Sequence, residues 1–247
     1  MAASSPILLV TGASRGIGAA IARLGARRGF DVAVNYLKDR KSADAVVADV
    51  NAAGRRGVAV QADMAREDEI IRMFDTVDRE LGRLTHLVYN TGIIGPASRV
   101  EALPTKEAKE ILDVNVLGAF IAARAAIPRL STKHRGAGGS MVFLSSAMAT
   151  LGGAGDYVMY SVSKAAIDTL TLGLARELAA EGIRVNAVAP GPIATDIHPP
   201  GRLDRLAAAV PLGRVGTAEE VAEAVIFMLS DASTFTSGVV LRVAGGR

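Results

Sequence analysis

A tyrosine and a lysine lie four positions apart at Tyr160 and Lys164, downstream of a serine pair at Ser145 and Ser146. On a helix, residues at this spacing share a face, about one turn from each other. A free tyrosine, with a pKa of about 10, exchanges protons poorly at neutral pH, and lowering that pKa to about 7 takes roughly 4 kcal/mol. A neighbouring ammonium favours the phenolate. The pair therefore has acid/base chemistry available, although the same spacing also occurs by chance on long helices.

Three glycines within seven residues follow an aliphatic run at 7–10, and helical spacing of apolar residues follows the glycines. A buried strand, a glycine turn and a helix together present free backbone N–H groups and a helix N-terminus to a phosphate. We expect Gly12 to allow the tight turn, Gly16 the close approach of a ligand, and Gly18 close packing of helix on strand. This stretch predicts a dinucleotide site.

Aliphatic segments alternate with helical segments along the chain. We expect strands at 7–10, 31–36, 57–61, 86–90, 141–144, 183–188 and 239–243. We expect helices after the glycine turn and at 43–53, 66–81, 104–128, 156–180 and 217–229. The pattern predicts an α/β fold, a doubly wound Rossmann-type parallel sheet of about seven strands with helices on both faces, in a single domain over 1–247. Such sheets bind ligands at the carboxyl ends of their strands, where the glycine turn, Ser146 and Tyr160 would converge.

The composition argues against several classes of function. Lys and Arg number 28 against 25 Asp and Glu, and aromatic residues make up 4% of the chain, so nucleic-acid binding has little support. With no cysteine, disulfides and thiolate sites are excluded. The histidines His86, His134 and His198 lack metal-ligand spacing, so we expect no metal, and we interpret His86 and His134 as surface or turn residues. Because there is no signal peptide and no continuous apolar run of about 18 residues, we expect a cytoplasmic protein without membrane contact.

Five motifs occur in order: residues 11–18 (Thr-Gly-Ala-Ser-Arg-Gly-Ile-Gly), Asn115, the serine pair, Tyr160 with Lys164, and residues 190–195 (Pro-Gly-Pro-Ile-Ala-Thr). Together they resemble the short-chain dehydrogenase/reductase family over essentially the whole chain. Within it the chain is most similar to glucose-dehydrogenase-like and 3-oxoacyl-carrier-protein-reductase-like members. The resemblance implies an enzyme that uses NAD(P) to interconvert a carbonyl and a secondary alcohol by hydride transfer.

The resemblance also implies the catalytic roles. Tyr160 would be the general acid in carbonyl reduction or the base in alcohol oxidation. Lys164 would hold the nicotinamide ribose hydroxyls and lower the pKa of the tyrosine. Ser146 would hydrogen-bond the substrate oxygen, and Asn115 would position a water that links Lys164 to a proton relay.

The implied cofactor contacts surround the dinucleotide from end to end. They are Gly12, Ser14, Arg15, Gly16, Ile17 and Gly18 at the phosphates and ribose, Asn35 and Tyr36 at the end of the second strand, Asp63 and Met64 at the adenine, Asn90 and Gly92 at the adenosine ribose, Tyr160 and Lys164 at the nicotinamide ribose, and Pro190, Ile193 and Thr195 at the carboxamide.

The end of the second strand decides which dinucleotide is preferred. NAD-binding enzymes usually carry an acid there for the ribose 2′-hydroxyl, whereas a 2′-phosphate needs a nearby cation. Here Lys38 follows the strand, Arg15 lies in the glycine turn, and the first acid, Asp39, comes later than the expected contact. NADP is favoured, and NAD remains possible if both cations are merely solvated.

The chain departs from the family pattern in two places. The usual Asn-Asn-Ala-Gly is here Tyr89, Asn90, Thr91 and Gly92, which has bulkier residues on the adenosine side. Fourteen positions also separate the second serine from the catalytic tyrosine, one more than expected, and we place the extra residue in the turn at 152–155.

These departures leave two competitors for catalytic roles. Ser145 remains a minor alternative to Ser146. Tyr157 competes with Tyr160, but the residue four positions after Tyr157 is Ser161 rather than a lysine.

The substrate end of the site is predicted to be apolar. Its expected walls are Ile94, Met148, Tyr157 and Gly191, which favour a neutral small-molecule carbonyl or alcohol over a strongly anionic one. By resemblance, a substrate lid covers about 191–215, where His198 and Arg202 would either contact substrate or lie in a solvated loop. Sugars, steroids, acyl carrier protein and xenobiotic carbonyls all remain open as substrates.

Two long apolar helices, at 107–130 and 156–180, together with the family resemblance, favour helix-paired dimers assembled into a homotetramer. A protein of another class, a catalytically silent NADP(H)-sensing binding protein, is the alternative function. It is disfavoured because a sensor needs no proton relay, and an oligomeric scaffold without cofactor would not explain the glycine turn.

Overall fold

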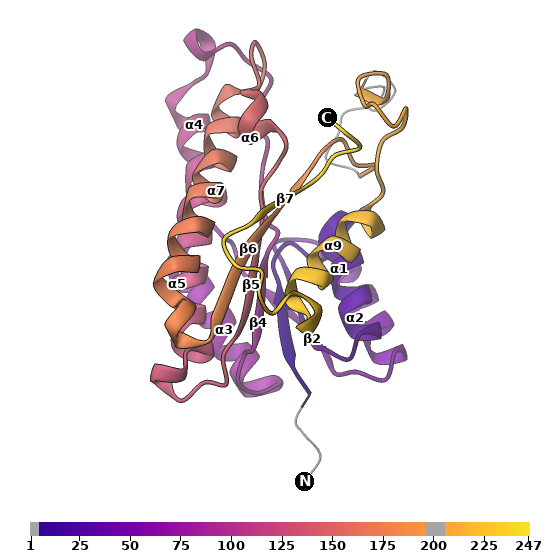
Figure 1. Cartoon of the computed structure of the whole chain (residues 1–247), viewed down its shortest axis with the longest axis vertical. Helices are drawn as coiled ribbons and strands as arrows, with labels where there is room; N and C mark the ends of the chain where they lie inside the picture. Colours follow the sequence, from indigo (N-terminus) through magenta and orange to yellow (C-terminus); the bar gives the residue numbers. More distant parts are fainter. Residues whose placement is uncertain (1–4, 196–205) are drawn as a thin grey trace.

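Seven parallel strands form one sheet in the order β3-β2-β1-β4-β5-β6-β7 (Figure 1). The computed structural model describes residues 5–195 and 206–247. The strands are β1 (Ile7–Val10), β2 (Asp31–Tyr36), β3 (Gly57–Gln61), β4 (His86–Tyr89), β5 (Gly139–Leu144), β6 (Ile183–Pro190) and β7 (Val240–Val243). The predicted doubly wound Rossmann-type sheet is confirmed.

Helices cover both faces of the sheet (Figure 1). One face carries α1 (Gly16–Arg27), α2 (Arg40–Ala52) and α9 (Ala218–Leu229), and the other carries α3 (Glu67–Glu80), α4 (Thr105–Leu112), α5 (Gly118–Leu130) and α7 (Val158–Leu178). Short helical turns lie at α6 (Met148–Leu151), Val100–Ala102, Thr132–His134, Ala179–Glu181 and Asp231–Ser233.

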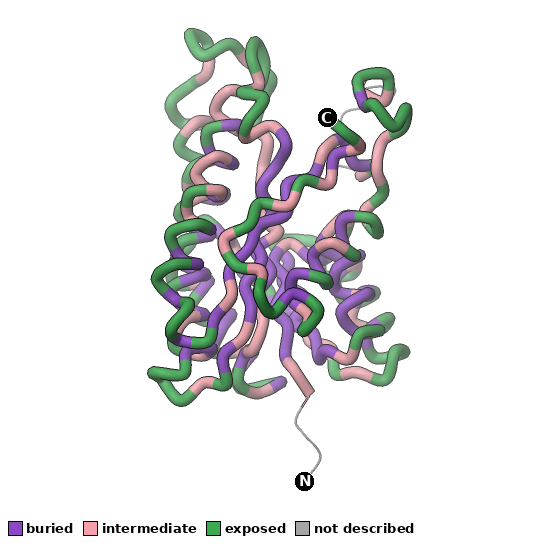
Figure 2. Tube along the Cα trace, in the orientation of Figure 1, coloured by how far each residue is buried: buried purple, intermediate pink, exposed green. Residues whose placement is uncertain are grey.

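Alternate residues of each central strand enter opposite cores, as the pleat of a strand requires. Met141 and Phe143 of β5 pack under α5 and α7, whereas Val142 and Leu144 pack under α1 and α9. The central strands are therefore buried on both faces (Figure 2). This double burial explains why continuous aliphatic runs predicted them.

The expected helix at 104–128 is continuous but contains a π-helical turn, Asp113–Leu117, between α4 and α5. The apolar spacing did not reveal this insertion. By length and mean hydropathy the stretch Thr105–Leu130 would suffice to cross a membrane, but 56% of its most apolar window is buried within the fold, as also occurs in core helices of soluble proteins.

Two other boundaries differ from the expected ones. Helix α2 begins at Arg40 rather than at 43 because Asp39 caps it, accepting a hydrogen bond from the Ser42 backbone N–H at 3.0 Å. Strand β6 runs on to Pro190, since its register with β7 pairs Pro190 with Val243. The predicted capping box at Thr217 and Glu220 is present and opens α9.

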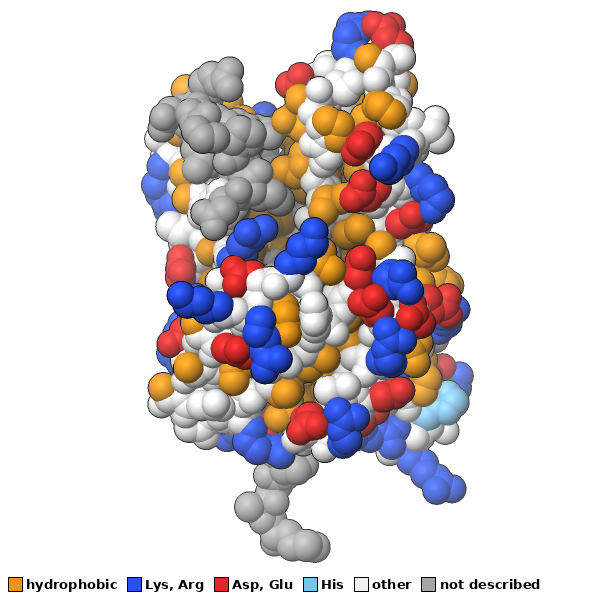
Figure 3. Space-filling model, turned by 180° about the vertical axis from the view of Figure 1, so that it is seen from behind, with side chains coloured by type: hydrophobic (Ala, Val, Ile, Leu, Met, Phe, Trp, Pro, Cys, Tyr) orange, Lys and Arg blue, Asp and Glu red, His pale blue; other side chains and the backbone are white. Residues whose placement is uncertain are grey.

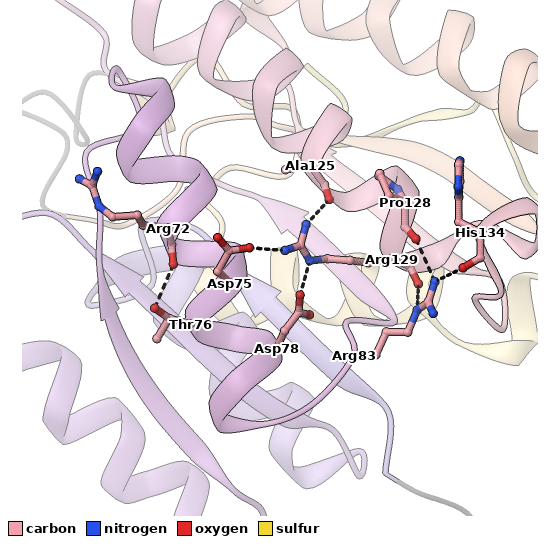
Figure 4. A network of polar contacts seen from close by, with 9 residues as sticks. All are labelled: Arg72, Asp75, Thr76, Asp78, Arg83, Ala125, Pro128, Arg129 and His134. Atoms are coloured by element: carbon pink, nitrogen blue, oxygen red, sulfur yellow. Dashed lines mark hydrogen bonds and ion pairs between the residues drawn. The ribbon is translucent and has the colours of Figure 1, made fainter.

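Arginines tie α3 to the end of α5 (Figure 4). Arg129 donates to the carboxylates of Asp75 and Asp78 on α3 at 2.8 and 2.7 Å. Arg83 donates to the Pro128 carbonyl at 2.9 Å, near the end of the helix, where carbonyls lack intrahelical partners. These contacts fix α5 at the end opposite the π-helical turn.

His86 is not the surface or turn residue that the sequence suggested. It lies in β4, its ring packs edge-on against Phe30 at 4.9 Å between centroids, and its Nδ1 lies 2.8 Å from the Thr85 hydroxyl. Burial lowers the pKa of His86 to about 4. His134 lies in an exposed turn, as expected.

On the face drawn in Figure 3, basic and acidic side chains of the described residues lie intermingled. Opposite charges pair across much of the surface, as in Arg23 with Asp49 and Arg124 with Glu67. Such exposed pairs add little to stability. Intermingled charges of this kind fit the near balance of acidic and basic residues in the composition.

Candidate active site

A cleft of 1310 Å³ lies at the carboxyl ends of the strands in the described part of the chain. It is formed by the segments that follow β1, β2, β4, β5 and β6 together with the start of α7. The predicted site residues that line it are Gly12, Ser14, Arg15, Gly16, Ile17, Tyr36, Asn90, Gly92, Ser146, Tyr160, Lys164, Pro190, Ile193 and Thr195. The expected substrate walls Ile94, Met148, Tyr157 and Gly191 also line it.

The glycine turn has the backbone geometry that the sequence predicted. Gly12 and Gly16 have left-handed φ values of +61° and +55°, which side chains rarely adopt. A Cβ on Gly18 would lie 2.4 Å from the Gly12 carbonyl oxygen, so only glycine permits this packing. Helix α1 begins at Gly16, and its N-terminus therefore faces the cleft.

Asn35 does not line the cleft but holds the glycine turn from beneath. Its Oδ1 accepts a hydrogen bond from the Gly12 backbone N–H at 3.0 Å. Its amide donates to the carbonyls of Val60 and Ala62 at 3.3 and 3.1 Å, so its hydrogen-bonding capacity is used within the protein. The side chain is fully buried, and this placement makes it a support for the phosphate turn rather than part of the cleft wall.

Asp63 and Met64 also lie outside the lining of the cleft. The carboxylate of Asp63 accepts from the Ala65 N–H at 2.9 Å, and its backbone N–H donates to Glu69 at 2.8 Å. Met64 packs in the core beneath α5.

The two bulkier residues at the end of β4 and just after it, Tyr89 and Thr91, are placed differently. Tyr89 points away from the cleft, and its hydroxyl donates to the Val114 carbonyl at 2.5 Å in the π-helical turn. Thr91 lines the cleft, but its hydroxyl oxygen is buried beneath Gly12 without a hydrogen-bond partner in the structure. Asn90 donates from its amide to the carbonyls of Thr11 and Gly12 at 2.9 and 3.1 Å, which fixes the loop against the glycine turn.

Tyr160 and Lys164 project from the first turns of α7 into the cleft. The Lys164 Nζ donates to the Leu144 carbonyl at 2.7 Å and lies 5.8 Å from the centroid of the Tyr160 ring. Burial lowers the pKa of Lys164 to about 8, and the negative charge of Asp168 partly opposes this shift. A Cβ on Gly92 would lie 3.1 Å from the Lys164 Nζ, so glycine leaves room for the ammonium.

The two serines after β5 use their hydroxyls differently. Ser146 accepts from the Met148 backbone N–H at 3.1 Å, which leaves its own hydroxyl proton available to donate. The buried Ser145 hydroxyl donates to the Lys164 carbonyl at 3.3 Å. Both residues line the cleft, and this difference supports Ser146 over Ser145 as the substrate contact.

Asn115 occupies the π-helical turn and is fully buried outside the cleft lining. Its Oδ1 accepts from the Ile93 N–H at 2.8 Å, and its amide donates to the Ile93 carbonyl and the Ser163 hydroxyl, both at 2.9 Å. Ser163 in turn donates to the Tyr160 carbonyl at 2.7 Å. Asn115 thus links the loop after β4 to the turn of α7 that carries the tyrosine.

The glycine turn and the end of β2 bring two cations to the far end of the cleft. Arg15 and Lys38 are both exposed and both line it. Asp39 lies there too, but its carboxylate accepts from both the backbone and the hydroxyl of Ser42. These hydrogen bonds lower the pKa of Asp39, with a smaller contribution from the charge of Arg15. The nearest acid is therefore engaged as a helix cap.

The comparisons with known proteins agree with this geometry. A family model described as Enoyl-(Acyl carrier protein) reductase matches residues 12–247. The chain belongs to the short-chain dehydrogenase/reductase family. As a short-chain dehydrogenase/reductase with relatives named as oxidoreductases, it is an oxidoreductase.

The similarity extends over whole proteins. The uncharacterized oxidoreductase YgfF of Escherichia coli (strain K12) is 43% identical over 245 residues, which cover 98% of this chain and 99% of that protein. A 3-oxoacyl-[acyl-carrier-protein] reductase of Synechocystis sp. is 36% identical, with 99% and 98% covered. A short-chain dehydrogenase from Burkholderia cenocepacia J2315, solved in complex with NADP, has a TM-score of 0.92 at 37% identity, with 98% and 97% covered.

Two predicted residues of this short-chain dehydrogenase/reductase lie outside the part of the chain that the structure describes. Three other residues of interest were not predicted from the sequence. His198 and Arg202 are outside the described residues, as is part of the expected lid at 191–215. Asp156 and Arg247 line the cleft although no motif marked them. Asp168 was also missed, and its position four residues after Lys164 was the available signal.

Proposed function

We propose that this oxidoreductase uses NADP to interconvert a carbonyl and a secondary alcohol, with Tyr160 as the general acid/base. The observation that supports this most is the meeting of Tyr160, Lys164 and the available Ser146 hydroxyl in the same cleft as the glycine turn. A fold alone would not carry this proposal, because function resides in the arrangement of specific groups.

The described cleft fits a dinucleotide. Its volume of 1310 Å³ exceeds that of a typical small-ligand site, which is about 300–1,000 Å³, and so leaves space for cofactor and substrate together. The left-handed Gly16 opposes Thr195, whose side chain would lie 3.5 Å from a Cβ on that glycine. We expect the phosphates at the N-terminus of α1, the adenosine at Asn90 and Gly92, and the nicotinamide near Ile193 and Thr195. The bound nicotinamide supplies or accepts the hydride.

The protein's own part in the reaction is to hold the substrate oxygen and move a proton. In reduction, the Tyr160 hydroxyl donates its proton to the carbonyl oxygen while the Ser146 hydroxyl hydrogen-bonds the same oxygen. The Lys164 ammonium stabilises the phenolate that Tyr160 then becomes. Asn115 keeps this part of α7 in place through Ser163 and, as the family resemblance implies, positions the water of a proton relay.

The preference for NADP over NAD rests on Arg15 and Lys38. Both cations line the end of the cleft beyond β2, and the first acid there, Asp39, caps α2. A ribose 2′-phosphate would find positive charge at this end, whereas a 2′-hydroxyl would find no free carboxylate. NAD remains a possible second cofactor. The NADP found in the Burkholderia cenocepacia relative agrees with this preference.

The substrate end favours a neutral, partly apolar small molecule. Ile94, Ala97, Met148 and Leu151 line it with Tyr157. Hydrophobic side chains also border the hollow at the top of the space-filling view (Figure 3). Apolar walls of this kind bind by removing apolar surface from water and discriminate weakly between similar apolar groups.

We further propose a single cytoplasmic domain that assembles into a homotetramer, without nucleic-acid or membrane partners. Leu117 and Phe120 near the π-helical turn and Val162 and Leu172 on α7 are large exposed hydrophobic residues on neighbouring helices of one face. A second copy that packed these helices against its own would cover them. Sedimentation of the purified protein at micromolar concentration tests this, since a monomer would contradict it.

A turnover screen tests the reaction itself. Purified protein with NADPH is offered an aldose, a steroid ketone, a simple aryl ketone, a 3-oxoacyl thioester and an α,β-unsaturated acyl thioester. Oxidation of NADPH by at least one carbonyl, lost in Tyr160→Phe, supports the proposal. Reduction of the unsaturated thioester alone would contradict carbonyl chemistry, and tight NADPH binding without any turnover would favour the sensing protein.

A further inference from the structure

A partly buried carboxylate, Asp168, lies one turn beyond Lys164 on α7 and has no part in the mechanism described above. Its Oδ1 is buried and has no hydrogen-bond partner in the structure. Burial raises the pKa of Asp168, while the Ser145 hydroxyl and the charges of Lys164 and Arg242 lower it. These three residues belong to the segment that follows β5, to the helix of Asp168 itself and to β7.

A carboxylate with one buried oxygen that lacks a hydrogen-bond partner is costly at a half-buried position. Burying a charged group without a full set of partners costs several kcal/mol, so an apolar residue would serve packing better. Arg242 acts on it through its charge alone: its guanidinium donates to the Thr150 hydroxyl and to the Arg247 carbonyl, and among the described residues it forms no ion pair with Asp168. The charge of Asp168 is therefore left facing Lys164.

Lys164 needs such a charge. Its Nζ is buried against the Leu144 carbonyl, and burial disfavours an ammonium. Among the described residues, Asp168 is the acid whose charge acts on this ammonium and favours its protonated form.

We propose that Asp168 is a positioning residue that keeps Lys164 in its ammonium form in the cleft. The single proton of the Ser145 hydroxyl can be given to the Lys164 carbonyl or to Asp168, and when it is given to Asp168 it stabilises the carboxylate. This inference rests on the proposed function in one respect, since it assumes that the Lys164 ammonium holds the cofactor ribose.

The pH dependence of NADPH binding tests this without turnover. NADPH fluorescence is titrated with protein from pH 6 to 9.5 for wild type, Asp168→Asn, Asp168→Glu and Lys164→Met, with circular dichroism to verify folding. We expect wild-type affinity to fall through a midpoint near about 8 that Lys164→Met lacks. Asp168→Asn should move this midpoint down by about one pH unit and weaken binding several-fold at pH 8 but not at pH 6.5. Asp168→Glu should restore the wild-type midpoint.

Two other results would overturn the inference. An unmoved midpoint in Asp168→Asn, or binding weakened equally at every pH, would leave Asp168 a merely structural role. If Asp168→Asn does not fold, Ser145→Ala must move the midpoint in the same direction by a smaller amount, and an unmoved midpoint then overturns it. Identical pH curves for wild type and Lys164→Met would instead contradict the proposed role of Lys164. That failure can be told from a failure of the inference about Asp168, because it is seen without any Asp168 variant.

Discussion

Lys164 donates to the backbone carbonyl of Leu144 at 2.7 Å. This bond holds the ammonium at the carboxyl end of β5, directly before the serine pair, while the lysine's own helix carries Tyr160 one turn earlier. The Lys164 ammonium is therefore held by the sheet as well as by its own helix. A strand end and a helix N-terminal segment together set the distance between the charged group and the tyrosine.

Removing the ammonium should affect both binding and catalysis. In Lys164→Met, the Tyr160 phenolate loses the ammonium that stabilises it. We expect the turnover rate to fall by about 10²–10⁴-fold, as for loss of a general acid/base. NADPH affinity should fall as well, since the ribose contact is lost. Steady-state kinetics and NADPH titration check this, and a variant with wild-type turnover would contradict the proposed role.

Carbonyl reduction should decline as the pH rises through about 8. Burial lowers the pKa of Lys164 to about 8, so the ammonium is present below this pH and is lost above it. Its loss raises the pKa of Tyr160 and removes the charge that stabilises the phenolate formed on proton donation. The pH profile of kcat/KM for NADPH-dependent reduction measures this, and a rate that still rises between pH 8 and 9.5 would be incompatible with it.

A methyl group on Gly18 should disrupt the phosphate turn. A Cβ there would lie 2.4 Å from the Gly12 carbonyl oxygen and 2.6 Å from the Asn90 amide nitrogen, so backbone must move. We expect Gly18→Ala to weaken NADPH binding by at least about tenfold and to lower the melting temperature, at a cost of about 1–3 kcal/mol for overpacking. Gly173→Ala is the control for NADPH binding, because this exposed α7 position lies outside the cleft lining and a Cβ there meets nothing within 4 Å in its own chain. Equal NADPH affinity for both variants would refute the expected role of the turn.

Arg15 and Lys38 should set the ratio of NADPH to NADH affinity. Replacing both by alanine removes the positive charge at the far end of the cleft, and we expect NADPH affinity to fall by about 10–100-fold, at about 1.4 kcal/mol per tenfold. NADH affinity should change by less than threefold, because NADH lacks the 2′-phosphate. Parallel titrations of wild type and variant decide this, and an equal loss for the two nucleotides would show that the cations do not discriminate between them.

Acid should destabilise the fold through His86. Its pKa is about 4 in the folded protein and about 6.5 when unfolded, so the unfolded state binds a proton first as the pH falls. The stability contributed by neutral His86 is complete above pH 6.5 and is lost between pH 6.5 and 4, by about 2 kcal/mol at pH 5 and by about 3 kcal/mol in all. Urea unfolding at pH 7.5 and 5 should show this loss in wild type and a smaller one in His86→Phe. The same loss in both proteins would assign the effect to other groups.

Strong periodic signals made the sheet and most helices predictable. Strands such as β1 and β5 are buried on both faces, so their sequences contain continuous apolar runs, at 7–10 and 141–144, which are typical of buried strands. The π-helical turn at Asp113–Leu117 was not predictable, since inserting one residue into a helix barely alters the spacing of its apolar residues. The four-residue helix α6 is too short to show any periodicity.

In the site, residue types predicted the groups but not always their placement. Ser146, Tyr160 and Lys164 reach the cleft because strand ends and one helix face determine where they point. Asn35 stands at the end of the second strand, where a cofactor contact was predicted, yet its amide donates hydrogen bonds to carbonyls of the β3 segment. Only the register of β2 with β3 brings these carbonyls beside it. The spacing of a single helix likewise could not show that the Asp168 Oδ1 lacks a hydrogen-bond partner.

The most direct test of the central claim is single-turnover oxidation of NADPH by wild type and Tyr160→Phe, using a carbonyl that is active in the substrate screen. Phenylalanine keeps the ring but removes the hydroxyl that donates the proton. The proposed function predicts an NADPH dissociation constant unchanged within about threefold and a hydride-transfer rate lower by about 10²–10⁴-fold. A rate within about threefold of wild type would contradict the assignment of Tyr160 as the general acid.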